Sequence, residues 1–131
     1  MFKFLFNFKA TFHIANIFLI ILYTYPGSFI GCYLYQDCNA EPQITKDFLI
    51  SSNHFYAFII LTFLALLAYK KSYKIKYVIF YLLFLSIFLE ILHLIIPVRY
   101  FELSDLFGNL IGVLIVISIR QLLKRYEIFK F

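Results

Sequence analysis

The sequence predicts an all-α integral membrane protein, built as a compact bundle of four transmembrane helices with both termini in the cytoplasm. The chain of 131 residues is 63% hydrophobic and 22% aromatic, whereas soluble domains are only about half apolar. Its mean hydropathy is +0.88. The apolar residues form four runs of the length that a bilayer core of about 30 Å requires, and basic residues flank these runs on one side. Because no hydrophilic block of domain size is present, residues 1–131 are expected to form a single transmembrane domain.

The four apolar runs are expected to form helices of about 16 to 23 residues each. They lie at residues 10–25, 54–69, 75–97 and 103–119. The second and fourth runs are short for a span, and both can be extended by one turn into their polar flanks. Ser51 and Ser104 are suitable N-capping residues there, because a serine hydroxyl accepts a hydrogen bond from the first unpaired backbone N–H groups.

The distribution of Lys and Arg predicts the orientation, because these residues remain mainly on the cytoplasmic side of a membrane. Ten of the 12 basic residues flank the same ends of the four runs: Lys3, Lys9, Lys70, Lys71, Lys74, Lys76, Arg120, Lys124, Arg125 and Lys130. Only Lys46 and Arg99 lie on the opposite side. The prediction is therefore a multi-pass protein of the cell membrane, with a long extracytoplasmic loop at 26–53 and a short one at 98–102.

The long loop contains both cysteines, Cys32 and Cys38. Outside the cytoplasm such a pair can close a small disulfide ring, or the two residues can remain free thiols near the membrane surface. A further alternative concerns the run SFIGC, which resembles a lipoprotein signal in which Cys32 is acylated and the first helix is removed. Phe29, three residues before the cysteine, fits that signal poorly. The sequence leaves open whether the first helix is retained.

Polar residues within the apolar runs point to a functional site. The stretch FLEILHLIIPVRYFELSDLFGNLIG, residues 88–112, is largely apolar yet carries two acids in the predicted spans, Glu90 and Asp105. Glu90 lies about seven residues, or roughly 10 Å, below the outer surface, too deep for its short side chain to reach water. An ionised carboxylate in hydrocarbon costs about 3 kcal/mol or more. Glu90 should therefore face the interior of the bundle or pair with a partner.

Helical periodicity places the polar residues on two facing surfaces. Glu90 and His93 share one face of the third run, and Asp105 and Asn109 share one face of the fourth. A linker of about five residues makes these two helices antiparallel neighbours. Arg99 is expected to neutralise Asp105 or Glu90, and Asn109 to bridge them. The expected cluster near the outer leaflet consists of His54, Glu90, His93, Arg99, Asp105 and Asn109.

Small residues and a second polar pair complete the pattern. Gly108 and Gly112 form a small-xxx-small pair that lets another helix backbone approach closely. His13 and Asn16 lie one turn apart near the cytoplasmic end of the first run, away from the cluster. Interhelical hydrogen bonding is the expected role of this pair.

The segments HFYAFIILTFLALL and FLEILHLIIPVRYFELSDLFGNLIG resemble the VanZ-like family of small bacterial membrane proteins, named for a teicoplanin-resistance accessory protein. The likeness covers about residues 54–116. The family pattern has a histidine that opens one helix, a Glu on the next, a Pro and an Arg beyond it, and an Asp and an Asn before a Gly. The matching positions are His54, Glu90, Pro97, Arg99, Asp105, Asn109 and Gly112.

The chain departs from that pattern at two points. Ile50 and Ser51 stand where the family usually has an Asp-Lys pair, and His93 stands where it commonly has Gln. The first departure removes charges from the loop side of the expected site, and the second adds a titratable group.

The resemblance implies a protein of the bacterial inner membrane with an outward-facing site that affects glycopeptide sensitivity, but it implies no defined reaction. We expect the site to bind or modify a lipid-linked or anionic component of the envelope. Arg99 would hold the anionic group, with His93 and Asn109 completing the binding site. The catalytic candidates, which would transfer protons, are His54, Glu90 and Asp105. The expected partners are membrane lipids and a lipid-linked envelope precursor.

Three other classes of function compete with this interpretation. A non-catalytic assembly or stability factor would use the same cluster for interhelical hydrogen bonding. A proton or ion pathway is less favoured, because the second and fourth helices lack titratable groups in their cytoplasmic halves. The third class is a metal site, whose ligands would come from His54, His93, Glu90 and Asp105. The positive charge of Arg99 in the same cluster disfavours a cation, so no metal or cofactor is expected.

Nucleic acid is excluded as a partner, since the basic residues form short clusters between apolar runs rather than one basic face. The sequence contains no phosphate-binding glycine loop, no HExxH motif and no nucleophile elbow. The chemistry of common soluble enzymes is therefore unsupported.

Overall fold

The computed structural model describes residues 7–126. Within them the chain forms five α-helices and no β-strand, which confirms the all-helical prediction. The helices are α2 (Phe8–Thr24), α3 (Phe29–Tyr35), α4 (Ser52–Ala68), α5 (Ile75–Leu92) and α6 (Leu103–Arg125). The short helix α3 lies inside the segment that was predicted only as a loop, 26–53.

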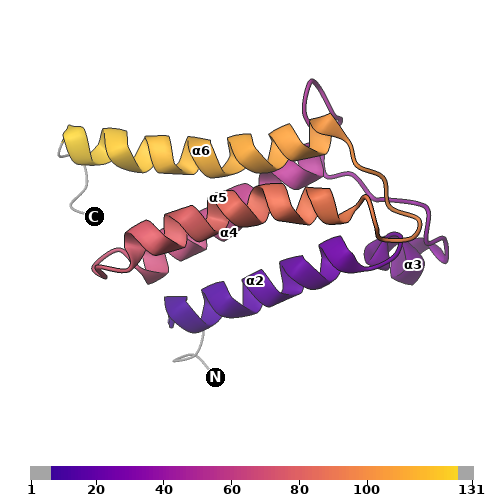
Figure 1. The fold of residues 1–131 in the computed structure, drawn as a ribbon, viewed down its shortest axis with the longest axis horizontal. Coiled ribbons are helices and arrows are strands. Elements are labelled where there is room, and N and C mark those ends of the chain that lie inside the picture. The colour runs from indigo at the N-terminus through magenta and orange to yellow at the C-terminus, as the bar shows by residue number, and fades with distance from the viewer. Residues whose placement is uncertain (1–6, 127–131) are drawn as a thin grey trace.

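Four long helices run side by side along the length of the molecule (Figure 1). α2 and α5 run in one direction, and α4 and α6 run in the other. α4 contacts α2, α5 and α6, and α5 also contacts α2 and α6. The α4–α5 turn and the first and last described residues lie at one end of the bundle (Figure 1). α3 and the long loop close the opposite end, which we call the loop end.

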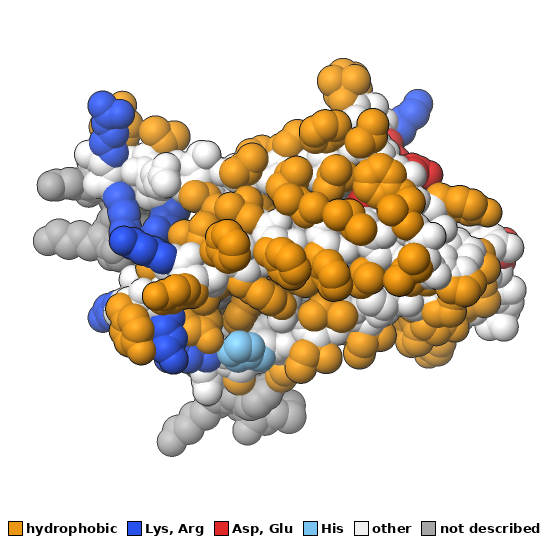
Figure 2. Space-filling model, viewed as in Figure 1, with side chains coloured by type: hydrophobic (Ala, Val, Ile, Leu, Met, Phe, Trp, Pro, Cys, Tyr) orange, Lys and Arg blue, Asp and Glu red, His pale blue; other side chains and the backbone are white. Residues whose placement is uncertain are grey.

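The described helices include membrane-spanning candidates. α5 and α6 are each long and apolar enough to cross a membrane. α2 and α3 count as a third span only if they are taken together, and the angle between these two helices is 81°. α4 is apolar but has only 17 residues. Apolar side chains cover the sides of the bundle, and Lys and Arg side chains gather at the end opposite the loop end (Figure 2). Length and composition therefore support two to three spans.

One apolar core joins the four long helices. Its most deeply buried members, each at most 1% exposed, are Phe58, Ala65, Leu82, Leu89 and Val113. Small and polar groups are also buried there, including the hydroxyls of Thr62 and Ser86. The Ser86 hydroxyl donates to the carbonyl of Leu83 at 2.7 Å, as buried serines in membrane helices commonly do.

α5 ends at Leu92 rather than at the predicted Pro97. Proline has no backbone N–H, and its ring clashes with the carbonyl four residues earlier, here that of His93. The chain tightens before the proline: the N–H groups of His93, Leu94 and Ile95 bond to carbonyls three residues back at 3.1, 3.0 and 3.0 Å. This tightened turn keeps His93 close to Glu90.

The ends of other helices also have local causes. α2 begins after Asn7, whose side chain accepts the N–H of Ala10 at 3.4 Å, and it ends at Thr24 because Pro26 follows. α6 continues to Arg125, beyond the predicted end at residue 119. Its last turns consist of good helix formers, and positive charges are favourable at a helix C-terminus.

α4 and α6 approach each other closely at two glycines of α6. A Cβ atom on Gly108 would lie 2.8 Å from the carbonyl oxygen of Ser51, and one on Gly112 would lie 2.7 Å from that of Phe55. Side-chain atoms do not occur so close to backbone oxygen, so only glycine permits this packing. The prediction that these glycines admit another backbone is confirmed, and that backbone belongs to α4.

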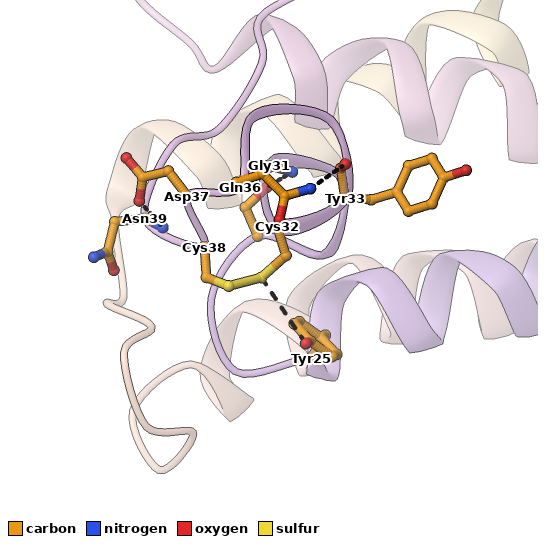
Figure 3. The surroundings of a disulfide bond; sticks show 9 residues. Tyr25, Gly31, Cys32, Tyr33, Gln36, Asp37, Cys38 and Asn39 are labelled. Atoms are coloured by element: carbon orange, nitrogen blue, oxygen red, sulfur yellow. Dashed lines mark hydrogen bonds between the residues drawn. A yellow bond between two sulfur atoms is a disulfide. The ribbon is translucent and has the colours of Figure 1, made fainter.

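A disulfide joins Cys32, within α3, to Cys38 in the turn that follows the helix (Figure 3). The Ser28 N–H donates to the carbonyl of Cys38 at 2.7 Å, and Ser28 Oγ accepts the N–H of Gly31 at 2.9 Å. Gly31 packs directly against the carbonyl of Ala40, where any side chain would collide. These contacts hold α3 and the following turn as one compact unit next to the end of α2.

Replacing Gly112 with Ala is expected to destabilise the bundle by about 1–3 kcal/mol, because its Cβ would overlap the Phe55 carbonyl unless α4 and α6 separate. Ser118→Ala, at an exposed position of the same helix, is the control and should leave stability unchanged. Thermal denaturation of the purified proteins in one detergent measures the difference. Equal melting temperatures for the two variants would contradict the close contact.

Candidate functional site

Three helices bring polar side chains together at the loop end of the bundle. His54, at the start of α4, is only 5% exposed. Its Nδ1 lies 3.1 Å from Asn109 Oδ1 and 3.8 Å from Glu90 Oε2, and its Nε2 lies 3.6 Å from Asp105 Oδ2. Glu90 comes from α5, and Asp105 and Asn109 come from α6. We call these four residues, together with His93, the polar cluster.

Asn109 determines which ring nitrogen of His54 carries a proton. Asn109 is fully buried, and its Nδ2 donates to the Ser86 carbonyl at 3.0 Å, which fixes the orientation of the amide. The amide oxygen therefore faces His54, and because that oxygen can only accept, His54 Nδ1 must donate. In the neutral ring the lone pair is then on Nε2, the atom that faces Asp105.

Glu90 is completely buried, and its two carboxylate oxygens differ in their surroundings. Oε1 accepts the backbone N–H of Glu102 at 3.1 Å and lies 3.3 Å from His93 Nδ1. Because His93 Nε2 donates to the Tyr23 carbonyl at 2.9 Å, a further proton must lie between His93 Nδ1 and Glu90. Oε2 faces His54 and has no hydrogen-bond partner among residues 7–126. Buried polar atoms without a hydrogen-bond partner are uncommon in proteins, and such an atom can mark the site of a bound ion or a catalytic group.

Tyr23, from α2, is a member of this site that sequence reasoning missed. Its hydroxyl donates to Asn109 Oδ1 at 2.6 Å, and its ring stacks on His93 with the centroids 5.8 Å apart. The ring also meets that of His54 edge-on, at 4.8 Å between centroids. A tyrosine near the end of an apolar run is typical of the membrane interface. Its burial becomes visible only when α2 is packed against the other helices.

Arg99 does not pair with Glu90 or Asp105, contrary to the prediction. Its Nε donates to the carbonyl of Tyr25 at 3.1 Å, and its Nη2 donates to that of Leu22 at 2.7 Å. These carbonyls lie at the end of α2, where the last turn has no intrahelical donors and the helix dipole is negative. The guanidinium therefore binds a helix end. The ion pairs in the described part of the chain join histidines to carboxylates.

Two cavities adjoin the polar cluster. The apolar cavity, of about 230 Å³, lies between α2 and α4 and has His54 in its wall. The polar cavity, of about 280 Å³, has His93 and Asp105 in its wall. An apolar and a polar compartment therefore meet beside the cluster. The residues that line both are Ser28, Glu41 and Arg99.

Three members of the polar cluster are spaced as metal ligands can be. One ligand atom each from His54, Glu90 and Asp105 lies within 4.8 Å of the others. His93 differs, because both of its ring nitrogens already have protein partners, Glu90 and the Tyr23 carbonyl. The five cluster residues predicted from the sequence thus lie together, but they have different contacts.

His13 and Asn16 lie outside the cluster and form interhelical hydrogen bonds, as predicted. His13 Nε2 lies 3.1 Å from the Tyr69 hydroxyl, and Asn16 Nδ2 donates to the Tyr81 hydroxyl at 2.6 Å. These bonds join α2 to the end of α4 and to α5.

Apolar helices arranged around a buried polar cluster define a small integral membrane protein with its polar groups inside the bundle. The particular family follows from comparison: the model of the VanZ/LLP1 family matches residues 2–124, nearly the whole chain, and the protein belongs to this family. The resemblance carried by His54, Glu90 and the residues after it is thus confirmed. No match was found among curated proteins or among solved structures.

Tyr23→Phe is expected to lower the stability of the protein by about 1 kcal/mol, because Asn109 Oδ1 loses its shorter hydrogen bond while the ring packing is kept. Tyr33→Phe is the matched control, since Tyr33 is 77% exposed. The measurement is the melting temperature of each variant in the same detergent. If both substitutions have the same effect, the buried hydroxyl does not hold α2 to α6.

Proposed function

We propose that this member of the VanZ/LLP1 family is a cell-envelope protein that binds a lipid-linked or lipid-like molecule with an anionic head group. The observation that carries the proposal is the pair of adjoining cavities, one apolar and one polar. An amphipathic ligand needs two such compartments side by side, with a few polar groups placed to orient it. His54 lines the apolar cavity and Asp105 lines the polar one, and these two residues, with Glu90 next to His54, could transfer protons if the bound molecule is also modified.

The apolar cavity suits a segment of a hydrocarbon chain. Leu19 and Leu22 of α2 and Ala57 and Ile60 of α4 line it. Its volume of about 230 Å³ is somewhat below the roughly 300–1,000 Å³ of pockets that enclose drug-sized ligands. A part of an acyl or prenyl chain therefore fits better than a whole lipid.

Arg99 lines both cavities, so its positive charge lies where a chain and a head group would join. A guanidinium recognises phosphate and carboxylate groups through paired hydrogen bonds. Its two bonds to the carbonyls of Leu22 and Tyr25 hold the planar group in place before any ligand arrives. This preorganisation lowers the entropic cost of binding an anion.

The proposal includes four membrane spans, with both termini in the cytoplasm and the loop end outside a bacterial inner membrane. The disulfide at the loop end supports this orientation, because disulfides persist in oxidising compartments. α4 would be about 26 Å long, and a locally thinned bilayer can accommodate it. Basic residues at the opposite end also favour a cytoplasmic location; in the described chain they are Lys9, Lys70, Lys71, Lys74, Lys76, Arg120, Lys124 and Arg125.

α3 supports a position of the loop end at the membrane surface. Its Tyr33, Leu34 and Tyr35 are 77%, 59% and 59% exposed, and aromatic and apolar side chains of this kind are typical of a lipid interface. Phe29 and Ile30 of the same helix line the apolar cavity. Membrane lipids would thus lie next to the proposed binding site.

The alternative function is a non-catalytic assembly or stability factor, and part of the polar cluster fits it. Asn109 and His93 use their polar atoms to join helices, as interhelical hydrogen bonds require. Glu90 Oε2, 3.8 Å from His54 Nδ1, and His54 Nε2, 3.6 Å from Asp105 Oδ2, are different, because both distances are too long for a hydrogen bond. The experiments below separate a binding site from purely structural bonding.

Ala57→Phe is expected to prevent lipid binding, because the ring would fill the apolar cavity beside His54. In native mass spectrometry the wild-type protein should retain phosphatidylglycerol in preference to phosphatidylcholine, and Ala57→Phe should weaken that retention by about 10-fold or more. Leu114→Phe, at an exposed position of α6, is the control and should retain lipid normally. Equal retention by both variants would contradict the proposed binding site.

The family resemblance adds a cellular prediction, lower sensitivity to teicoplanin. Cells that contain the wild-type protein should tolerate more teicoplanin than cells with an empty vector, and Glu90→Gln and Arg99→Gln should abolish the difference at matched membrane levels. Lys46→Gln, an exposed basic residue of the same loop end, is the control. If cells with the wild-type protein are as sensitive to teicoplanin as cells with an empty vector, the protein does not have this phenotype. Loss of the two variants from the membrane would favour the structural alternative.

A further inference from the structure

We infer that His54, Glu90 and Asp105 form a binding site for a divalent transition-metal ion, with zinc as the best-matched ion. The sequence disfavoured a cation because Arg99 was expected within the cluster. The structure weakens that objection, since Arg99 pairs with neither carboxylate and two of its guanidinium nitrogens are bonded to carbonyls at the end of α2. What remains at the centre of the cluster is one imidazole and two carboxylates, whose ligand atoms lie within 4.8 Å of one another.

The distance between His54 Nε2 and Asp105 Oδ2 matches a shared metal ion better than a hydrogen bond. Asn109 fixes Nδ1 as the protonated nitrogen, so Nε2 presents its lone pair to a carboxylate oxygen 3.6 Å away. Hydrogen bonds between such atoms are shorter, about 2.7–3.2 Å. Two atoms that each bind zinc at about 2.1 Å in a tetrahedral site lie roughly 3.4 Å apart. A cation between them would also remove the repulsion between the two lone pairs.

Glu90 supplies the third ligand. Its side chain is completely buried, and Oε2, which lies 3.8 Å from His54 Nδ1, has no hydrogen-bond partner among the described residues. A buried carboxylate oxygen is unfavourable unless a donor or a cation binds it. The other oxygen, Oε1, is held by the Glu102 N–H and by His93. Only Oε2 is therefore available to a cation, and one ligand atom of each of the three residues lies within 4.8 Å of the others.

Hydrogen bonds from neighbouring residues orient the proposed ligands, as they do around metal sites in general. Asn109 accepts from His54 Nδ1 and is itself fixed by the Ser86 carbonyl. His93 lies against Glu90 and is fixed by the Tyr23 carbonyl. The His54 ring is thus positioned through Nδ1 and the Glu90 carboxylate through Oε1, which leaves Nε2 and Oε2 for an ion.

The ligand set selects the class of ion. One imidazole nitrogen with two carboxylate oxygens suits zinc and neighbouring transition metals, whereas magnesium and calcium prefer oxygen ligands alone. Three protein ligands leave a coordination position for water or for an oxygen atom in the polar cavity, whose wall includes Asp105. A cation here would attract an anionic head group despite the acids Glu41 and Glu102 in that wall. Only this last link rests on the proposed function.

The metal content of the full-length protein tests the inference without any lipid ligand. The protein, purified in detergent with a tag that contains no histidine, is stripped with a chelator, equilibrated with zinc and analysed by mass spectrometry of the bound metal. The wild-type protein is expected to bind about one zinc ion per chain. Asp105→Asn and Glu90→Gln, which keep the side-chain shape, should weaken zinc binding by about 100-fold or more. His13→Gln removes a histidine outside the cluster and should bind zinc as wild type does.

Cobalt(II) gives a second readout on the wild-type protein alone, so a variant that fails to fold does not decide the result. Cobalt in a four-coordinate site should produce visible absorption bands that added zinc abolishes. The inference is overturned if wild type binds neither ion, if the two acid variants bind zinc normally, or if His13→Gln loses as much zinc as they do. Normal zinc binding without any lipid preference would contradict the proposed function and leave the metal site established.

Discussion

The burial of one carboxylate inside an apolar bundle constrains the whole loop end of this protein. Glu90 is inaccessible to solvent, and an unpaired carboxylate in such surroundings is unfavourable. Its neighbours come from three segments of the chain: His93 just beyond α5, the backbone of Glu102 in the linker, and His54 of α4. Because Pro97 ends α5 early, the chain turns tightly enough for His93 and Glu102 to reach the same carboxylate oxygen. The connection between α5 and α6 is therefore part of the site.

Close packing of α4 against α6 sets the position of His54 within that site. A Cβ atom on Gly108 would lie 3.2 Å from His54 Cβ, so the histidine is pressed against the surface of α6. Asp105 and Asn109 lie on the same side of α6, and they contact the two ring nitrogens of His54. A larger residue at Gly108 would move the ring away from both. In this bundle the packing of the helices and the chemistry of the cluster cannot be changed independently.

The polar cluster contains two kinds of atoms, which explains why a structural and a functional role can coexist. Asn109, His93 and Tyr23 have hydrogen bonds that join α2, α4, α5 and α6, and such bonds hold membrane helices together. The carboxylates of Glu90 and Asp105 instead lie 3.8 Å from His54 Nδ1 and 3.6 Å from His54 Nε2, distances too long for direct hydrogen bonds. The hydrogen bonds of the first group orient the side chains of the second, in which His54 lines the apolar cavity and Asp105 lines the polar one.

The sequence by itself determined the all-helical, apolar architecture, because hydropathy and the length of apolar runs depend on composition and order alone. It also identified five residues of the polar cluster, since helical periodicity and a short linker place Glu90, His93, Asp105 and Asn109 on facing surfaces and His54 at the same level. The position of Arg99, the burial of Tyr23 and the helix α3 were decided only by the tertiary structure. Arg99 bonds to carbonyls 74 and 77 positions earlier in the chain. Its long side chain could reach several acceptors, and the choice among them depends on where α2 ends in space, which no local pattern of residues encodes.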